Sequence, residues 1–351
     1  MPPLLALTDL AKDFVLRRGG RGRVQAVAGV SLTLAVGETL GLVGETGCGK
    51  STLARLALRL LEPSGGRIAF DGQDITAWSP RRLLPVRRRM QAVFQDPLAS
   101  LNPRLSIAQS LAEPFRTHRV TPPGGVAARI AELLAFVGLE GIDPTRRPAQ
   151  FSGGQLQRIG IARALALEPA LIVADEPTSA LDPSIQAQII NLLLRVQRAR
   201  GVAYLLISHD LDVVGHMADR IAVMYLGVVV EVAPAAVLLR APWHPYTQAL
   251  LSAAPTLAAR RDRSWRRITL AGDLPNPADA PSGCRFHPRC ALAAAVCRTG
   301  APALRAVGGE GRSVACHLAP DETHARGAAV GLARLGRAAP ARPAAQQQDA
   351  K

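Results

Sequence analysis

A glycine-rich segment near the start of the chain carries the clearest chemistry in the sequence. It fits the pattern Gly-x4-Gly-Lys-Ser and consists of Gly44, Glu45, Thr46, Gly47, Cys48, Gly49, Lys50, Ser51 and Thr52. Glycines allow the backbone to turn its N–H groups inward, where they can cradle phosphate oxygens. The lysine can reach the outer phosphates of a nucleotide, and the hydroxyl that follows it can bind Mg²⁺. The segment therefore predicts a phosphate-binding loop.

The residues on either side of this loop predict the elements that hold it. Residues 39–43 form an apolar run, and residues 53–60 have a helical apolar pattern. Strand, glycine turn and helix in that order are the context that phosphate binding requires, and the helix N-terminus adds positive potential. The alternative is an accidental glycine turn followed by Lys-Ser, which this context disfavours.

Two further apolar runs end in groups that can act on a phosphate. Residues 171–174 are followed by Asp175 and Glu176, and residues 203–207 are followed within two positions by His209. Ligand groups gather at the C-terminal ends of strands in parallel sheets, so this placement favours a functional site. Strands that alternate with helices predict a mostly parallel sheet with helices on both faces.

Two polar motifs lie between these runs. Gln95 ends a short strand at residues 89–94, and Pro97 breaks that strand. The string Ser152, Gly153, Gly154 and Gln155 precedes a helical pattern at residues 156–165, where the serine is suited to cap the helix.

Composition and charge limit the class of protein. The 351 residues are 48% apolar and 20% charged, as in a soluble globular protein with one large or two modest domains. The chain lacks an apolar run of ~20 residues and a secretory signal, so we expect it to be cytoplasmic. The net charge of +15 includes arginine clusters at 81–89 and 260–267. With 4% aromatic residues and no basic-aromatic interleaving, nucleic acid is not an expected partner, and an anionic membrane surface is preferred.

Cysteines are concentrated near the C-terminus. A cytoplasmic chain is not expected to use its five cysteines as a disulfide framework, and one of them lies in the phosphate-binding loop. The others are Cys284, Cys290, Cys297 and Cys316. Their spacing lacks the paired C-x2-C of most zinc ribbons, whereas four thiolates suit a [4Fe–4S] cluster. We therefore rank an iron–sulfur cluster first, zinc second and inert buried thiols third. Zinc remains an alternative because His287 and His317, which flank the cysteines, could also be ligands.

Taken in order, these motifs resemble the nucleotide-binding subunit of an ABC transporter. The Ser-Gly-Gly-Gln string separates ABC ATPases from other proteins with a phosphate-binding loop. Residues 94–104, 244–251 and 283–290 are similar to segments of the dipeptide/oligopeptide (and nickel) importer ATPases, and the resemblance covers about residues 4–320. One departure is Ala149, where that family leads us to expect histidine.

The resemblance implies an α/β fold, a P-loop ABC ATPase with a RecA-like core, a helical subdomain and a small cysteine-containing C-terminal extension. The nucleotide-binding domain would span residues 1–255, with its helical subdomain at about 96–165. The oligopeptide/dipeptide-transporter extension would span residues 256–325, and the Ala-, Arg- and Gln-rich residues 326–351 predict a disordered tail. The family also implies an iron–sulfur cluster in some members.

The resemblance assigns roles to the motif residues. ATP would lie on the phosphate-binding loop, where Lys50 stabilises charge on the phosphates. The implied ligands of Mg²⁺ are Ser51, Gln95 and Asp175. Glu176 would be the general base for the attacking water, and His209 would contact the γ-phosphate and hold Glu176 in place. Gln95 would also sense the membrane subunit.

Other residues are implied to act at the base or across a dimer. Phe14 stands where the family stacks an aromatic ring on adenine. Ser152 and Gly154 would contact the γ-phosphate held by a second ATPase subunit, and Asp182 would communicate across that interface. One cassette per chain means that the second subunit is another chain, either a paralogue or a second copy in a homodimer.

These roles imply import of di- or oligopeptides, powered at the cytoplasmic face of the membrane by a peripheral subunit. Two permease subunits would be direct partners, and an extracytoplasmic solute-binding protein would be an indirect one. The alternatives are another cargo, such as nickel, glutathione or another small solute, and a soluble ABC ATPase that acts on ribosomes or DNA. The latter class usually has two cassettes or a coiled-coil insertion, and we find neither in the sequence.

Overall fold

The computed structural model describes residues 2–15, 23–253 and 267–319. The predicted tail at 326–351 and most of the arginine cluster at 260–267 lie outside this part of the chain. Within it, the largest sheet has eight strands in the order β11-β12-β10-β9-β3-β8-β7-β6. Its strands are β3 (Thr39–Val43), β6 (Met90–Val93), β7 (Leu171–Asp175), β8 (Ala203–Ile207), β9 (Arg220–Tyr225), β10 (Val228–Pro234), β11 (Arg305–Ala306) and β12 (Ser313–Val314).

The centre of this sheet is parallel, as the sequence predicts. Strand β3 pairs with β8 on one side and β9 on the other, with Leu42 beside both Ile207 and Ala222. Every residue of β3 and β8 is buried, which explains why these strands are continuous apolar runs without alternation. Their C-terminal ends therefore lie along one edge of the sheet, next to the phosphate-binding loop.

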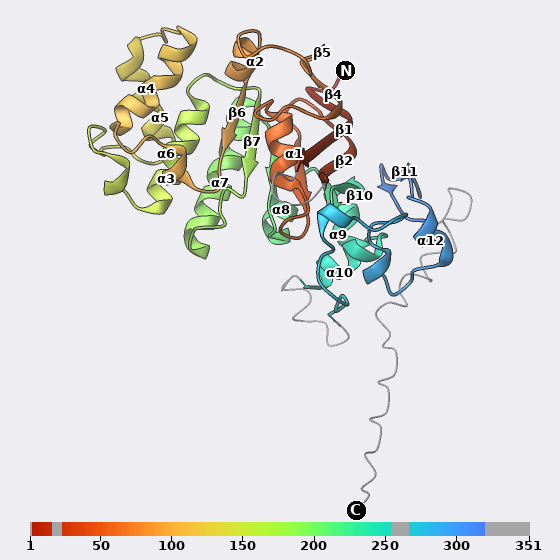
Figure 1. Cartoon of the computed structure of the whole chain (residues 1–351). Coiled ribbons are helices and arrows are strands. Elements are labelled where there is room, and N and C mark those ends of the chain that lie inside the picture. Colours follow the sequence, from red (N-terminus) through yellow and green to blue (C-terminus); the bar gives the residue numbers. More distant parts are fainter. Residues whose placement is uncertain (1, 16–22, 254–266, 320–351) are drawn as a thin grey trace, which may run out of the picture.

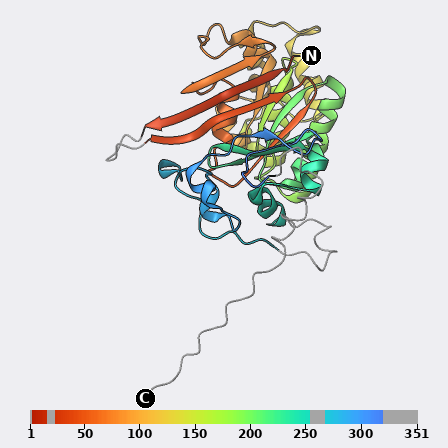
Figure 2. The same ribbon diagram turned by 90° about the vertical axis from the view of Figure 1, so that its right-hand side faces the viewer.

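A smaller antiparallel sheet lies against the central one (Figure 2). Its order is β2-β1-β4-β5, with strands β1 (Leu5–Val15), β2 (Arg23–Leu34), β4 (Gly65–Phe70) and β5 (Gln73–Asp74). Leu10, Val27 and Ile68 from this sheet share a buried core with Leu42 and with Leu53 of the following helix. That core fixes the start of the helix, and therefore the loop, between the two sheets.

The helices cover the central sheet and form a separate group at one side (Figure 1). Those that follow its parallel strands are α1 (Lys50–Ala57), α7 (Pro183–Arg200) and α8 (Leu211–Met217). The group at the side consists of α3 (Pro97–Ser100), α4 (Ile107–His118), α5 (Gly125–Phe136) and α6 (Gly153–Leu165), and α2 (Leu84–Arg89) precedes β6. This side group lies in the region where the sequence predicts a helical subdomain.

The C-terminal extension adds strands to the same sheet (Figure 1). It follows α9 (Ala235–Arg240) and α10 (Pro245–Ala253), and includes two single-turn helices, η2 (Pro277–Asp279) and η3 (His287–Arg289), and α12 (Ala295–Thr299). Strand β12 pairs antiparallel with β10, where Val314 lies opposite Glu231. The extension therefore continues the sheet that carries the phosphate-binding loop, an arrangement that was not predicted from the sequence.

A buried ion pair joins the extension to β10. Arg312 Nη1 lies 3.1 Å from Glu231 Oε1, and the two side chains are 3% and 0% exposed. The backbone N–H groups of Trp243 and His244 also donate to the Glu231 carboxylate. The carboxylate is therefore desolvated but fully hydrogen-bonded, as a buried charge must be.

Across the described ranges, no helix is both long and apolar enough to cross a membrane.

Candidate active site

The phosphate-binding loop has a backbone that only glycine can adopt at its key turns. Gly44 and Gly49 have φ values of 155° and 109°. A Cβ on Gly44 would lie 2.2 Å from the carbonyl oxygen of Met224, and one on Gly49 would lie 2.3 Å from that of Ala26. These contacts are with backbone, which cannot turn aside, so the loop is packed tightly between β2 and β9.

The Lys50 side chain is held against the first residues of this loop. It begins α1, is 6% exposed, and its Nζ donates to the carbonyl oxygens of Gly44 at 2.8 Å and Glu45 at 3.0 Å. Its other contact is the Cys48 sulfur at 3.9 Å, and among the described residues no carboxylate forms an ion pair with it. A buried ammonium without a carboxylate partner is a site for an anion. This arrangement is suited to phosphate oxygens.

The two carboxylates at the end of β7 have different surroundings. Asp175 Oδ1 accepts a hydrogen bond from Ser51 Oγ at 3.1 Å, so two predicted Mg²⁺ ligands are adjacent. Burial raises the pKa of Asp175, the hydrogen bond from Ser51 opposes this rise, and the neighbouring Glu176 charge adds to it. A divalent cation at this position would offset the cost of burying the ionised carboxylate.

Glu176 lies at a strained position of the backbone. Its φ is 48°, in the left-handed region that residues other than glycine seldom adopt, and its N–H donates to Ile207 O at 2.9 Å. Its Oε2 lies 3.4 Å from His209 Nδ1, and the two side chains are 17% and 56% exposed. The strain is consistent with a residue placed for chemistry.

A cavity of about 410 Å³ brings most of the predicted catalytic residues together. It is lined by the phosphate-binding loop from Thr46 to Thr52 and by Gln95, Glu176 and His209. These groups come from β3, β6, β7 and β8, and they meet because the C-terminal ends of parallel strands share one edge of the sheet.

Several predicted site residues do not line this cavity: Gly44, Glu45, Asp175, Phe14, residues 152–155 and Asp182. Phe14 is 39% exposed on β1, where Lys12 Nζ lies 5.3 Å from its ring centroid. Ser152 caps α6, accepting from Gln155 N–H, and Asp182 caps α7 without a side-chain hydrogen bond. Residues 152–155 and 182 therefore belong to another part of the surface.

Other residues of the cavity wall, and the contacts behind the loop, were not predicted from the sequence. Gln25, Ala26 and Gly227 line one side, and Pro277 of the extension also faces the cavity. None belongs to a motif with a fixed spacing from the loop, and no sequence signal would have identified them. Their contribution depends on the strand pairing that brings β2 and β10 to the loop.

Helix α10 and the extension both contact the loop directly, through Glu45. Tyr246 Oη accepts a hydrogen bond from the Glu45 N–H at 2.8 Å. Arg289 donates to both carboxylate oxygens of Glu45, at 2.7 Å from Nη1 and 3.3 Å from Nη2. Both residues lie in segments that carried the family resemblance, but no local pattern in the sequence predicts their contact with the loop.

The predicted iron–sulfur cluster receives no support. Within the described residues, no group of three or more His, Cys, Asp or Glu side chains is arranged to hold a metal ion. Cys297 and Cys316 are buried, and Cys284 and Cys290 are half-buried. Burial raises the pKa of the Cys284 and Cys316 thiols, and raises that of Cys290 to about 11. The four thiols gather in one region, but as they lie they do not fit a cluster.

Zinc receives no more support, because the described residues contain no group of three or more His, Cys, Asp or Glu side chains arranged to hold a metal ion. His287 Nδ1 lies 3.0 Å from the carbonyl oxygen of Cys284, and His317 Nε2 lies 2.8 Å from that of Gly300. A hydrogen bond from one ring nitrogen to a backbone carbonyl leaves the other ring nitrogen available to a metal. The arrangement of the side chains, and not these two hydrogen bonds, is therefore what leaves zinc without support.

Two family models match the chain. The ABC transporter model matches residues 27–179, and the model for the oligopeptide/dipeptide transporter C-terminal region matches residues 230–297. The first spans β3, the loop and both carboxylates at the end of β7. The second begins in β10 and reaches α12.

Curated relatives are similar over nearly the whole chain. The oligopeptide transport ATP-binding protein AppF of Bacillus subtilis is 50% identical over 320 residues, which are 90% of this chain and 97% of that protein. The di/tripeptide transport ATP-binding protein DppF of Pseudomonas aeruginosa is 45% identical over 91% of this chain and 98% of its own length.

Solved ABC cassettes share the fold. The cassette MJ0796, solved as a dimer in a post-hydrolysis state with ADP and Pi, superimposes with a TM-score of 0.59 at 28% identity, covering 66% of this chain and 98% of its own. The cbiO1 subunit of Clostridium perfringens, part of the transporter complex cbiONQ, has a TM-score of 0.58 at 29% identity, with coverages of 68% and 96%. These matches confirm the predicted fold class. Together with the family models and the relatives, they establish that the chain belongs to the ATP-binding subunits of ABC transporters, in the dipeptide/oligopeptide importer family.

Proposed function

We propose that this chain binds and hydrolyses ATP as the translocase subunit that drives import of di- or oligopeptides. The observation that carries the proposal is the cavity of about 410 Å³ that unites the phosphate-binding loop with Gln95, Glu176 and His209. A loop alone would support nucleotide binding only. A carboxylate and an imidazole facing the same space support hydrolysis.

Phosphate binding rests on charge and backbone geometry. Lys50 Nζ now donates to the carbonyl oxygens of Gly44 and Glu45. When ATP binds to the loop, this ammonium group would donate to the outer phosphate oxygens in their place. Mg²⁺ would be held by Ser51 and Asp175, whose side chains already touch, with Gln95 nearby in the cavity. When bound, the metal neutralises charge on the phosphates.

Hydrolysis requires a water aligned with the γ-phosphate. Glu176 would accept a proton from this water as its oxygen bonds to the γ-phosphorus and the bond to the β-γ bridging oxygen breaks, giving ADP and phosphate. His209, 3.4 Å from the Glu176 carboxylate, would orient it and contact the γ-phosphate. Phe14 would stack on adenine from the C-terminal end of β1.

A complete site would need a second subunit. Residues 152–155 and 182 lie outside the cavity that contains this chain's own loop, so they are free to complete the site of a partner. The related cassette MJ0796 is described as a dimer. We propose a head-to-tail dimer with a paralogue or a second copy, in which Ser152 and Gly154 close over the partner's ATP.

The proposed cargo follows from the relatives. AppF is named for oligopeptide transport and DppF for di/tripeptide transport, and this chain matches both at 45–50% identity over nine-tenths of its length. We propose a peripheral position at the cytoplasmic face of the membrane, two permease partners and indirect coupling to a solute-binding protein. Nickel, glutathione or another small solute is the second candidate, because cargo is selected by subunits other than this one.

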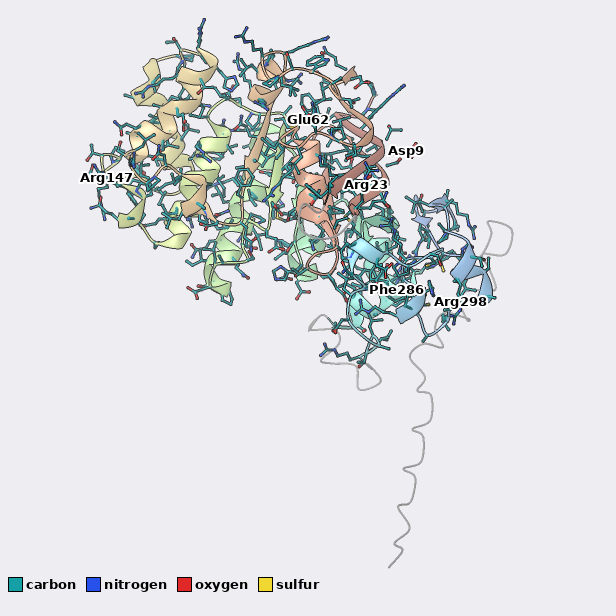
Figure 3. The ribbon with its side chains drawn as sticks, in the orientation of Figure 1. Asp9, Arg23, Glu62, Arg147, Phe286 and Arg298 are labelled. Carbon is teal, nitrogen blue, oxygen red and sulfur yellow. The ribbon has the colours of Figure 1, made fainter. Side chains whose placement is uncertain are left out.

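The test is ATP hydrolysis by the full transporter, assembled with candidate permease pairs in vesicles. Glu176→Gln is expected to retain ATP binding and lose at least about a hundredfold in turnover, because the water loses its proton acceptor. The matched control is Glu62→Gln. Glu62 is an exposed residue that follows the C-terminal end of α1, whereas the loop precedes its N-terminal end (Figure 3). Undiminished turnover in Glu176→Gln would refute the assignment of the base.

The same preparation tests the transport role. The chain is expected to co-purify with two permeases, and peptide uptake into the vesicles is expected to depend on ATP. Co-purification with ribosomes or DNA instead would favour a non-transport ABC ATPase. ATP-dependent uptake of nickel or glutathione without peptide uptake would change the cargo and leave the ATPase assignment intact.

A further inference from the structure

Glu45 is the point at which the C-terminal extension meets the phosphate-binding loop. The two guanidinium nitrogens of Arg289 donate to its two carboxylate oxygens, at 2.7 and 3.3 Å, and Tyr246 accepts from its N–H at 2.8 Å. Bidentate Arg–carboxylate pairs are among the strongest hydrogen-bonded contacts, and they fix orientation as well as distance. One loop residue is therefore held by both its side chain and its backbone.

The partners of Glu45 are themselves fixed by packing. Phe286 is 2% exposed and immediately precedes η3, the single turn that carries Arg289. Figure 3 labels Phe286 within the C-terminal part of the chain. Its ring centroid lies 5.2 Å from that of Tyr225 and 5.5 Å from that of Tyr246. The Arg289 side chain is only 9% exposed. A shift of this aromatic cluster would therefore move the groups that hold Glu45.

The charge of Glu45 makes this contact relevant to nucleotide binding. A carboxylate inside a loop that receives phosphates repels them unless a cation compensates it. Arg289 is that cation, because its guanidinium pairs directly with Glu45 while Lys50 Nζ is bonded to backbone carbonyls. Both side chains of the pair are partly desolvated, which limits screening by salt.

We propose that Arg289 and Tyr246 are positioning residues of the ATP site, acting through Glu45, and that the extension, together with the preceding helix α10, thereby sets the affinity of the loop for ATP. Arg289 neutralises and orients the Glu45 carboxylate, and Tyr246 anchors the backbone of the same residue. The extension then contributes to nucleotide binding, in addition to adding strands to the central sheet. This inference rests on the proposed ATP site.

The experiment measures the dissociation constant of the full chain for a fluorescent ATP analogue with Mg²⁺. Arg289→Ala is expected to weaken binding about tenfold, since it leaves the Glu45 carboxylate uncompensated on the loop that receives the phosphates. Arg289→Lys keeps the charge and is expected to lose no more than about threefold. The weakening by Arg289→Ala is expected to be greater at low salt than at high salt.

A second substitution separates the charge effect from a fold defect. The double variant Glu45→Gln/Arg289→Ala removes both charges, so it is expected to recover most of the affinity that Arg289→Ala loses. Arg298→Ala, an exposed arginine at the end of α12 on the same extension, is the matched control and is expected to bind as the unmodified chain does (Figure 3). Recovery in the double variant cannot come from a fold that Arg289→Ala has damaged.

The outcomes are distinguishable. If the unmodified chain binds the analogue and Arg289→Ala binds equally well, the inference is wrong and the ATP site stands. If the double variant is as weak as Arg289→Ala, the electrostatic argument is wrong. If the unmodified chain fails to bind, the proposed function itself fails. In the assembled transporter, the effect of Arg289→Ala is expected in KM for ATP, with kcat nearly unchanged.

Discussion

Removing Arg312 is expected to detach the C-terminal extension locally from the central sheet. The substitution Arg312→Met keeps the apolar stem of the side chain and deletes the cation that pairs with Glu231. The carboxylate would remain 0% exposed, with the N–H groups of Trp243 and His244 as its donors. An unpaired charge in such a site is far more costly than the loss of a surface contact.

The expected cost follows from this burial. Breaking a buried pair by removing one partner destabilises proteins by about 3–5 kcal/mol. Burial already raises the pKa of Glu231, with the backbone N–H donors and Arg312 opposing the rise. A group whose pKa is raised on folding favours the folded state at low pH and loses that contribution as pH rises. The deficit of Arg312→Met is therefore expected to be largest at neutral pH and to shrink toward pH 5.

Hydrogen exchange read by mass spectrometry on peptides from β10 and β12 is the appropriate assay. About 3 kcal/mol corresponds to roughly a hundredfold faster exchange through local opening. Arg240→Met is the matched control, because Arg240 and Glu310 form an exposed pair with atoms 3.6 Å apart, and exposed pairs contribute less than about 1 kcal/mol.

A second substitution decides whether the unpaired charge is the cause. Glu231→Gln added to Arg312→Met retains an acceptor for the two N–H groups and removes the charge, so it is expected to restore much of the protection. Exchange in Arg312→Met that matches the unmodified chain at pH 7 would refute the reasoning. So would a double variant that is no better protected than Arg312→Met.

Three further perturbations have clear expected outcomes. Gly49→Ala places a Cβ 2.3 Å from Ala26 O, so loss of nucleotide binding and a lower Tm are expected in a thermal shift assay with and without ATP. Gly154→Ala places one 2.7 Å from Ile185 Cγ2, a side chain that can move, so the fold is expected to persist while ATP-dependent dimerisation falls in light scattering. Burial lowers the pKa of His244 to about 3, so His244→Asn is expected to reduce the loss of stability between pH 7 and pH 5 by about 2 kcal/mol in urea unfolding.

Each of these has a result that would count against it. Gly49→Ala with unchanged ATP affinity would mean that the loop tolerates a shift of β2. If Gly154→Ala dimerises normally, the proposal that residues 152–155 lie at the dimer interface is wrong. For His244, stability conferred by the neutral ring is present above pH 6.5 and is lost as pH falls toward 3. A variant with the same pH dependence as the unmodified chain would therefore contradict the burial argument.

The sequence was a sufficient guide to the central sheet and to the residues at its edge. Fully buried strands must be apolar along their whole length, so β3 and β8 stand out as continuous runs that a reader of the sequence can identify. Phosphate binding also restricts residue types locally, because Gly44 and Gly49 have conformations and neighbours that admit no side chain. Local constraints of this kind leave patterns with fixed spacing.

The prediction of an iron–sulfur cluster finds no support in the structure, for the opposite reason. Spacing along the chain gives the number of thiols, but metal binding depends on how the side chains lie in three dimensions. Within the described residues, no group of three or more His, Cys, Asp or Glu side chains is arranged to hold a metal ion. Contacts in this region also join distant positions, such as His317 and the carbonyl oxygen of Gly300, 17 positions apart, and no local pattern predicts them.

What the sequence determined about this protein is the phosphate-binding loop, the order of strands and helices around it, and the residues at the strand ends that line the same cavity, because each follows from a local pattern in the chain. Only the tertiary structure decided that the extension joins the same sheet and that Arg289 pairs with Glu45 across 244 positions. Such a contact depends on how β12 docks on β10 and on the packing of three aromatic rings. Docking is a property of surfaces that form only once the chain has folded.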